Sequence, residues 1–296
     1  MNPINLIFLC SLATAAGLMV RTKVQEGIQS NHGKPMLLGQ SKLSSTEAKS
    51  KIVWLLGDSN SWLAVIDFCV KAQVNITGVQ IHKIWDRLYC TSGGLTMIYS
   101  FHPGASNPPY FAHPNHGPFL NTTQEMVRSE LHELRQIFGK PPDAIVVNSD
   151  HWDVATWWVH MKGPRTWSIP DWRINYWCRE TVPHFLDFVQ DLVPTAHVAL
   201  RSPPPCRNDK SRPMYYAVSE TIDEMATCLR KSTRRANHLF TSKKSKYRFI
   251  DWNQIVNRKV QSEGGNLTQW YRDETHPGPE LTELEVGPIL DWVKRI

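Results

Sequence analysis

A run of apolar residues that ends in a Gly-Asp-Ser turn constrains the fold of this chain more than any other feature. Residues 52–56 are Ile-Val-Trp-Leu-Leu, followed at once by Gly57, Asp58 and Ser59. Strands of parallel sheets are covered on both faces, so they carry continuous apolar runs rather than alternating ones. A helical pattern of apolar residues then occupies residues 61–71. The segment therefore predicts a buried strand, a tight turn that presents a serine hydroxyl, and a helix.

Strand-like and helix-like patterns continue to alternate along the rest of the chain. The predicted strands are residues 52–56, 74–81, 95–101, 144–147, 197–200 and 247–251, and the predicted helices are 61–71, 122–138, 176–192, 219–235 and 284–296. This alternation is typical of a parallel sheet with crossover helices on both faces. We therefore predict a single α/β domain over residues 50–296, with three layers (α/β/α) and a mainly parallel sheet.

An aspartate and a histidine far along the chain complete a possible catalytic set with the serine. Asp273 and His276 are separated by only two residues and can occupy one loop. A serine alone is a poor nucleophile, but a histidine within hydrogen-bond reach can take its proton, and an acid can orient that histidine. Gly-Asp-Ser turns and Asp-x-x-His pairs are each common by chance. The strand before Ser59 and the helix after it give the combination its weight, and predict a Ser/His/Asp hydrolase.

Asn148 is the predicted donor to the oxyanion. It ends the apolar run 144–147, and ligands of open α/β sheets bind at the carboxyl ends of strands. The amide of Asn148 can donate a hydrogen bond, whereas Asp150, the alternative at this turn, cannot do so while ionised. The backbone N–H of Ser59, near a helix start, is the second predicted donor.

These blocks resemble the SGNH (GDSL-like) hydrolase superfamily. Ser59, Asp273 and His276 stand where that superfamily keeps its triad. Residues 143–152, Asp-Ala-Ile-Val-Val-Asn-Ser-Asp-His-Trp, and residues 198–203, Val-Ala-Leu-Arg-Ser-Pro, resemble its PC-esterase and trichome-birefringence-like branch. The resemblance implies an SGNH/flavodoxin-like fold. It also implies an esterase or acyltransferase that acts on O-acyl esters, above all O-acetyl esters, of a polysaccharide or other glycan.

The chain departs from the family pattern in two blocks. Residues 60–62 are Asn-Ser-Trp, whereas many relatives have leucine directly after the serine or arginine three residues on. The glycine of the second family block is equally well placed at Gly93, Gly94 or Gly104. The identity of the substrate and the choice between hydrolase and transferase do not follow from the sequence.

Two other functions fit parts of the sequence. A catalytically silent SGNH-like module that binds glycans is compatible with the altered oxyanion blocks. A metal-dependent hydrolase would use His113 and His116, with His102 and His151 near them. Helical His-x-x-x-His spacing is absent and loops fix ligands poorly, so we predict no metal and no cofactor.

The N-terminal residues predict a cleaved leader. Residues 4–20 are uncharged and mostly apolar, with small residues before Ala16, which is typical of a signal peptide over residues 1–15. The stretch is shorter than the roughly twenty apolar residues of a membrane helix. Basic residues follow it rather than precede it, which is the reverse of the bias that a lumenal anchored enzyme needs. The alternative is a Golgi-type anchor through residues 4–20. Residues 16–49 are polar and predict a flexible N-terminal segment.

Three sequons agree with secretion or residence in the secretory lumen. Asn75, Asn121 and Asn266 each begin an Asn-x-Ser/Thr triplet without proline, and such triplets are acceptors for glycans in secreted proteins. We therefore predict glycosylation at these asparagines. No stable membrane insertion is expected after the leader is removed.

The cysteines also suit an oxidising compartment. Those that remain after the leader are Cys69, Cys90, Cys178, Cys206 and Cys228. Some should pair, and the odd count leaves one that is free or intermolecular. Connectivity cannot be derived from the sequence, and the lack of a Cys-x-x-Cys pair argues against structural zinc.

The charge and composition of the chain limit the classes of binding partner that we expect. The net charge is +6, and residues 230–248 contain eight Lys/Arg with no acidic residue. Such a run is a solvated face, or attracts an acidic polysaccharide. No recognition motif for nucleic acid is present, so nucleic acid is not a predicted partner. Most of the twelve tryptophans are expected to serve packing, because each buries a large area.

Overall fold

A computed structural model gives the fold of the chain. It describes residues 50–74, 76, 87–106, 112–113, 117–118, 122–149, 151–161, 169–206, 219–235, 247–273 and 275–296. The predicted signal peptide (1–15) and N-terminal segment (16–49), the sequons at Asn75 and Asn121, and Asp150 all lie outside the described residues.

Six strands form one sheet within this part of the chain, in the order β2-β3-β1-β6-β7-β8. They are β1 (Lys51–Gly57), β2 (Leu88–Ser92), β3 (Leu95–Phe101), β6 (Ala144–Asn148), β7 (His197–Arg201) and β8 (Arg248–Ile250). Only the edge strand β2 pairs antiparallel, whereas the other pairings are parallel. A separate two-stranded ribbon joins β4 (Ala112–His113) to β5 (Gly117–Pro118).

Helices connect the strands. They are α2 (Ser59–Lys71), α3 (Thr123–Phe138), α4 (His151–Met161), α5 (Asp171–Tyr176), the π-helical turn η2 (Trp177–Thr181), α6 (Val182–Leu192), α7 (Ser219–Arg235), α8 (Trp252–Ser262), the 3-10 turn η3 (Leu267–Trp270) and α9 (Pro279–Val293). Among the described residues, none of these helices has both the length and the apolar character needed to cross a bilayer.

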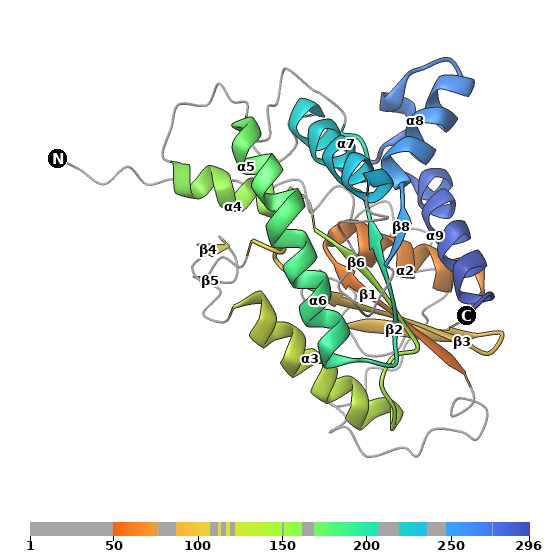
Figure 1. Cartoon of the computed structure of the whole chain (residues 1–296). Helices are drawn as coiled ribbons and strands as arrows, with labels where there is room; N and C mark the ends of the chain where they lie inside the picture. The colour runs from red at the N-terminus through yellow and green to blue at the C-terminus, as the bar shows by residue number, and fades with distance from the viewer. Residues whose placement is uncertain are drawn as a thin grey trace.

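The pleat of β1 divides the core into two layers. Alternate residues of a strand face opposite sides of the sheet. Ile52, Trp54 and Leu56 pack with buried residues of α3, α6 and α7, whereas Val53 and Leu55 pack with α2 and α9. Figure 1 shows these two sets of helices on opposite faces of the twisted sheet. The predicted single α/β domain with three layers is therefore confirmed.

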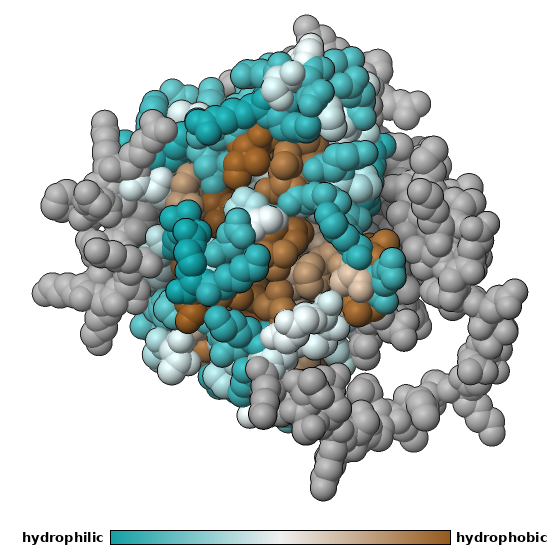
Figure 2. All heavy atoms as spheres, turned by 90° about the vertical axis from the view of Figure 1, so that its right-hand side faces the viewer, coloured by the Kyte–Doolittle hydropathy of each residue, from teal (hydrophilic) through white to brown (hydrophobic). Residues whose placement is uncertain are grey.

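Figure 2 shows the side of the molecule on which α8 and α9 lie in Figure 1. Hydrophobic residues gather in the middle of this face, and hydrophilic residues lie around them.

The parallel register brings several strand ends to one edge. Gly57 of β1 pairs with Phe101 of β3, and Asn148 of β6 pairs with Arg201 of β7. Strand β1 lies between β3 and β6. The residues that follow these strands therefore share the carboxyl edge, where open α/β sheets place their ligands.

Most predicted elements are present with shifted ends. Helix α3 begins one residue later than predicted, and its N-cap is Thr122. The Thr122 hydroxyl accepts from the Glu125 N–H, and the Glu125 carboxylate accepts from the Thr122 N–H. This reciprocal capping box fixes the helix start.

The hairpin β2–β3 was missed. The strand predicted over 74–81 lies mostly outside the described residues, and β3 pairs instead with Leu88–Ser92. Gly93 and Gly94 connect the two strands with positive φ angles of 57° and 77°. Glycine adopts such angles readily, and two-residue hairpin turns require them. The adjacent glycines Gly93 and Gly94 are the sequence feature that indicates this hairpin turn.

The predicted helix over 176–192 is confirmed, but it begins earlier and contains a π turn. Pro183 has no N–H to donate and its ring crowds the carbonyl four residues before it. The backbone widens just before this proline, where the Val182 N–H bonds to the Trp177 carbonyl. A π turn of this kind absorbs a proline without ending the helix.

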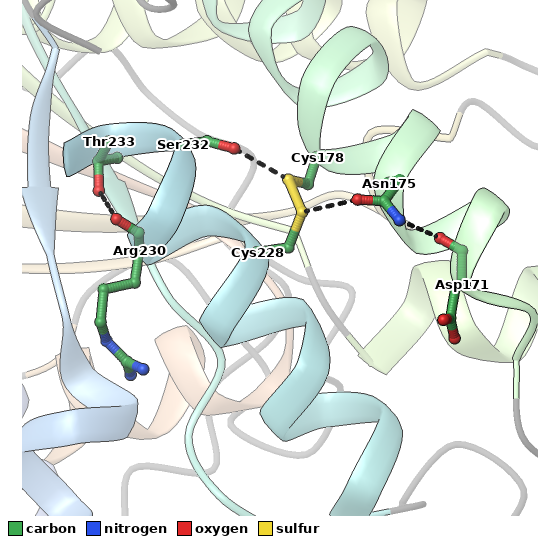
Figure 3. Close-up of a disulfide and its surroundings, with 7 residues drawn as sticks. All are labelled: Asp171, Asn175, Cys178, Cys228, Arg230, Ser232 and Thr233. Atoms are coloured by element: carbon green, nitrogen blue, oxygen red, sulfur yellow. Dashed lines mark hydrogen bonds between the residues drawn. A yellow bond between two sulfur atoms is a disulfide. The ribbon is translucent and has the colours of Figure 1, made fainter. Parts of the chain in front are cut away.

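Two disulfides join elements that are distant in sequence. Cys69 of α2 bonds to Cys90 of β2, and Cys178 of η2 bonds to Cys228 of α7. Figure 3 shows the second bridge between its two helices, with the Ser232 hydroxyl 3.2 Å from the Cys178 sulfur. Cys206 is free and buried. The predicted mixture of paired cysteines and one free cysteine is confirmed, and the bridges indicate an oxidising compartment.

We predict that the double variant Cys69→Ala/Cys90→Ala loses about 3 kcal/mol of unfolding free energy, because the bridge closes a loop that the unfolded chain would otherwise sample freely. The bridged residues are 21 apart in sequence. Urea unfolding followed by tryptophan fluorescence measures the loss. Under a reducing agent the wild type opens the same bridge, so most of the difference should vanish. Equal stability of the two proteins under oxidising conditions would contradict the prediction.

Candidate active site

Ser59 is presented by a helix start at the carboxyl edge of the sheet. Strand β1 ends at Gly57, and Asp58 is the N-cap of α2, where its carboxylate accepts from the Asn60 N–H at 2.9 Å. Ser59 is the first residue of the helix. The N–H groups of a first helical turn have no acceptor inside their own helix, and the helix dipole favours negative charge beside them. The predicted strand, turn and helix place the serine as expected.

Ser59, His276 and Asp273 lie in hydrogen-bonded series. The Nε2 of His276 is 2.8 Å from the Ser59 Oγ, and its Nδ1 is 2.6 Å from the Asp273 Oδ2. Ionised Asp273 only accepts, so Nδ1 carries a proton and a neutral His276 offers Nε2 to the serine hydroxyl. The structure brings together all three residues that the sequence predicted as a triad.

The environment of Asp273 keeps it ionised. Burial raises the pKa of this carboxyl, but the side-chain hydrogen bond of His276, its charge when protonated, and two backbone hydrogen bonds together outweigh that rise. The backbone N–H groups of Thr275 and His276 donate these two hydrogen bonds, each 2.9 Å. The pKa of Asp273 therefore lies well below its ordinary range, and the residue can orient His276 at any neutral or mildly acidic pH.

The loop that carries Asp273 and His276 is closed by backbone hydrogen bonds. The Arg272 N–H donates to the His276 carbonyl at 2.8 Å, and the Gly278 N–H donates to the Trp270 carbonyl at 2.7 Å. Tyr271 at the base of the loop packs with buried residues of α8 and α9. We call residues 270–278 the histidine loop.

Asn148 packs behind the turn that presents Ser59. Its side-chain oxygen accepts from the Asp58 N–H at 3.3 Å and from the Ser61 hydroxyl at 2.9 Å. A backbone N–H can only donate, so the oxygen of the Asn148 amide is the atom that faces it. A Cβ on Gly57 would lie 1.5 Å from this oxygen. The sequence predicted Asn148 as a donor, whereas its anchoring contact with the turn was not foreseen.

Of the three candidate glycines of the second block, Gly104 lies at the carboxyl edge. Gly93 and Gly94 form the hairpin at the opposite end of β3. The Gly104 N–H donates to the His102 Nδ1 at 3.1 Å. A Cβ on Gly104 would lie 2.7 Å from the Asp153 carboxylate. Gly104 therefore serves close packing of this loop against α4.

His102 is fully buried beside the site and neutral. Because its Nδ1 accepts from Gly104, its proton is on Nε2, which donates to the Asn148 carbonyl at 2.5 Å. Burial lowers the pKa of His102 from 6.5 to about 4, against the smaller opposing effects of this hydrogen bond and of Asp58. His102 therefore joins the ends of β3 and β6 through its hydrogen bonds.

A set of buried polar groups behind Ser59 was not foreseen. The His151 Nε2 is 2.9 Å from the Cys206 sulfur, and its Nδ1 is 3.7 Å from the Asp58 Oδ2. Arg201 lies 3.8 Å from the Asp58 Oδ1 and 2.5 Å from Glu285 of α9. His151 and Arg201 lie in residues 143–152 and 198–203, the segments singled out in the sequence analysis. No sequence pattern near Glu285 indicates its contact with Arg201.

The metal hypothesis finds no support in the described part of the chain, where no three His, Cys, Asp or Glu side chains gather around one point. His102 and His151 make the contacts given above. The side chain of His113 and the whole of His116 lie outside the described residues.

Tryptophans were expected to serve mainly packing, and their exposure in the structure tests this. Trp157 and Trp177 are buried in the core, whereas Trp172 is 65% exposed on α5. Packing is therefore the role of the first two.

Comparisons with known proteins find solved structures of low similarity and no match in sequence. No family model matches the chain, and no curated protein matches its sequence. The chain is similar to a GDSL-like lipase from Bacteroides thetaiotaomicron, with 12% identity, coverage of 95% of this chain and 98% of that chain, and a TM-score of 0.45. It is also similar to Est24, a carbohydrate acetylesterase from Sinorhizobium meliloti, with 12% identity, coverage of 83% and 99%, and a TM-score of 0.48. An aryl esterase of M. smegmatis has 12% identity, coverage of 83% and 99%, and a TM-score of 0.47.

Buried neutral His102 should make stability pH-dependent. Between pH 6.5 and about 4 the unfolded chain binds a proton at this histidine and the folded chain does not, so stability falls as the pH falls through this window. We predict that the wild type loses about 3 kcal/mol more than His102→Gln between pH 7 and pH 4. Glutamine keeps one donor and one acceptor without titrating. Urea unfolding at both pH values measures the difference, and parallel losses in the two proteins would refute it.

Proposed function

We propose that the protein is a serine ester hydrolase or acyltransferase that uses Ser59, His276 and Asp273. The observation that carries this proposal is the contact of 2.8 Å between the His276 Nε2 and the Ser59 Oγ, with the Asp273 carboxylate on the other ring nitrogen. Nucleophile, base and orienting acid need this order of contacts. The three residues come from two segments far apart in sequence, so their convergence is a property of the fold.

The proposed reaction has two steps. Ser59 attacks the ester carbonyl while His276 takes its proton, and an acyl-enzyme forms as His276 protonates the departing alkoxide. An acceptor hydroxyl then attacks the acyl group, with His276 again as the base, and Ser59 is released. Asp273 holds His276 in the required tautomer and stabilises its cationic form.

Two donors are proposed for the oxyanion. The Ser59 N–H belongs to the first turn of α2, where N–H groups and the helix dipole favour negative charge. The side-chain amide of Asn148 is held beside the same turn by the bonds that its oxygen accepts. Fixed donors of this kind need no reorganisation when charge develops.

The proposed substrate is an O-acyl, above all O-acetyl, ester of a polysaccharide or other glycan. The resemblance of residues 143–152 and 198–203 to the PC-esterase branch supports this class. The acceptor is water in an esterase and a sugar hydroxyl in a transferase, and the same three residues serve both.

The proposed location is the secretory lumen or the extracellular space. The two disulfides agree with an oxidising compartment. Asn266 is exposed, as glycosylation requires, and the leader over residues 1–15 supplies the route. An anchor through residues 4–20 is the alternative, distinguished by whether the N-terminus of the recovered protein begins near Ala16.

The silent glycan-binding module is the second candidate. The altered residues after Ser59 favour it, whereas the complete series of contacts from Ser59 to Asp273 favours catalysis. An active purified protein excludes the silent module.

We predict that Ser59→Ala and His276→Ala each lower kcat on p-nitrophenyl acetate by about 10⁶-fold, and that Asp273→Asn lowers it by about 10⁴-fold, because the aspartate supports the base without taking the proton. A fluorophosphonate probe should label Ser59 in the wild type only. Acetylated polysaccharide, with and without a sugar acceptor, separates esterase from transferase. Full activity of Ser59→Ala would eliminate this mechanism.

Asn148→Ala should lower kcat by about 10²–10³-fold through loss of an oxyanion donor. The matched control is Ser61→Ala, which loses the same Ser61–Asn148 hydrogen bond but keeps the amide. Both variants should lose about 1 kcal/mol of stability, and only Asn148→Ala should lose most of its turnover per folded molecule. Equal kcat values in the two variants would show that Asn148 serves the turn alone.

A further inference from the structure

Ser59 and Asp67 lie on one face of helix α2. They are eight residues apart, which is close to two full turns at about 3.6 residues per turn. Residues at this spacing are offset by about 80° around the axis, so both belong to one broad face of the helix. The distance between them along the axis is about 12 Å.

The histidine loop contacts both of these residues. His276 reaches Ser59 at the start of α2, and Arg272 reaches Asp67 two turns further on. One terminal nitrogen of Arg272 donates to both carboxylate oxygens of Asp67, at 2.9 Å and 3.1 Å. The loop therefore lies along the face of α2 and contacts it at two points.

The Arg272–Asp67 pair is well protected from solvent. The two side chains are 16% and 17% exposed, so the pair is screened less than a surface ion pair. Burial raises the pKa of Asp67, while the charge of Arg272 and its hydrogen bond to the carboxylate oppose that rise. The hydroxyl of Thr282 on α9 donates to the Gly278 carbonyl at the end of the histidine loop.

Arg272 is also bonded to His276 through the backbone. Its N–H donates to the His276 carbonyl, and Asp273 directly follows it in the chain. A shift of Arg272 along α2 would therefore move both Asp273 and His276 relative to Ser59.

We propose that Arg272 and Asp67 are positioning residues, which fix the histidine loop against α2 so that His276 meets the Ser59 hydroxyl. This inference rests on the proposed function for its kinetic consequence. The pair touches neither Ser59 nor the imidazole, so it acts only through the loop.

A second ion pair on the same helix provides the matched control. Lys71 of α2 bonds to Glu283 of α9 at 2.9 Å, with side chains 68% and 54% exposed. It joins α2 to a neighbouring element but is not part of the histidine loop. Exposed pairs of this kind contribute little to stability.

The test compares Arg272→Gln, Asp67→Asn, their double variant, Arg272→Lys and the control Lys71→Gln. Displacement of reacting groups by about 1 Å can cost about 100-fold in rate. We expect Arg272→Gln and Asp67→Asn each to lower kcat on p-nitrophenyl acetate by about 10- to 100-fold with KM within about twofold. The double variant should be no worse than either single one, because both remove the same contact. Arg272→Lys should recover much of kcat, and Lys71→Gln should match the wild type.

A readout independent of activity separates this inference from the proposed function. Carbethoxylation of His276 by diethyl pyrocarbonate, followed by peptide mass spectrometry, reports how firmly the ring is held. It should be several-fold faster in Arg272→Gln than in the wild type and Lys71→Gln, at a temperature where all three proteins are fully folded. An inactive wild type with this pattern would reject the proposed function and retain the inference. Unchanged carbethoxylation, or a fall in kcat that follows only a fall in folded protein, would overturn the inference.

Discussion

Parallel pairing of β1 with β3 on one side and β6 on the other aligns the strand ends from which the site is built. Ser59 follows β1, His102 follows β3 and Asn148 ends β6. The three are then joined across the strand ends, because His102 donates to the Asn148 carbonyl and the Asn148 side chain accepts from the turn before Ser59. A slip of one residue in either pairing would turn every side chain of a strand to the other face. The register of the sheet therefore also fixes the geometry of the site.

Buried charge is the second constraint at this edge. Asp58 is 3% exposed and directly precedes Ser59, where, on the proposed function, an isolated carboxylate would oppose a developing oxyanion. Arg201 and His151 lie beside its two oxygens, and the Asn60 N–H bonds to it. Glu285 in turn contacts Arg201. Breaking such a set by removing one member is costly, because it leaves a buried charge without its partner. The groups that balance Asp58 thus belong as much to the site as to the core.

The sequence was most informative where a residue's role depends on its own segment. The apolar run before Gly57, the capped helix α3 and the Asp273/His276 pair are local patterns, and they predicted the layers, most elements and all three triad candidates. The contacts that escaped prediction join distant segments: Glu285 with Arg201, Asn148 with Ser61, and Asp67 with Arg272. Each of these contacts depends on how the helices pack on the sheet. The spacing of apolar residues within one segment does not encode that packing. The hairpin β2–β3 is different, since the Gly93-Gly94 pair that forms its turn is itself a local pattern.

The contact between Ser59 and His276 spans 217 residues of chain. A ribosome adds about 5–20 residues per second, so β1 and α2 are made about 10–40 s before the histidine loop. During that interval neither His276 nor Asp273 is present beside Ser59, whatever else has folded around it. Hydrolytic capacity, on the proposed function, begins only when the loop docks on α2. On the same proposal, the nascent chain stays inert toward esters while it is still being made.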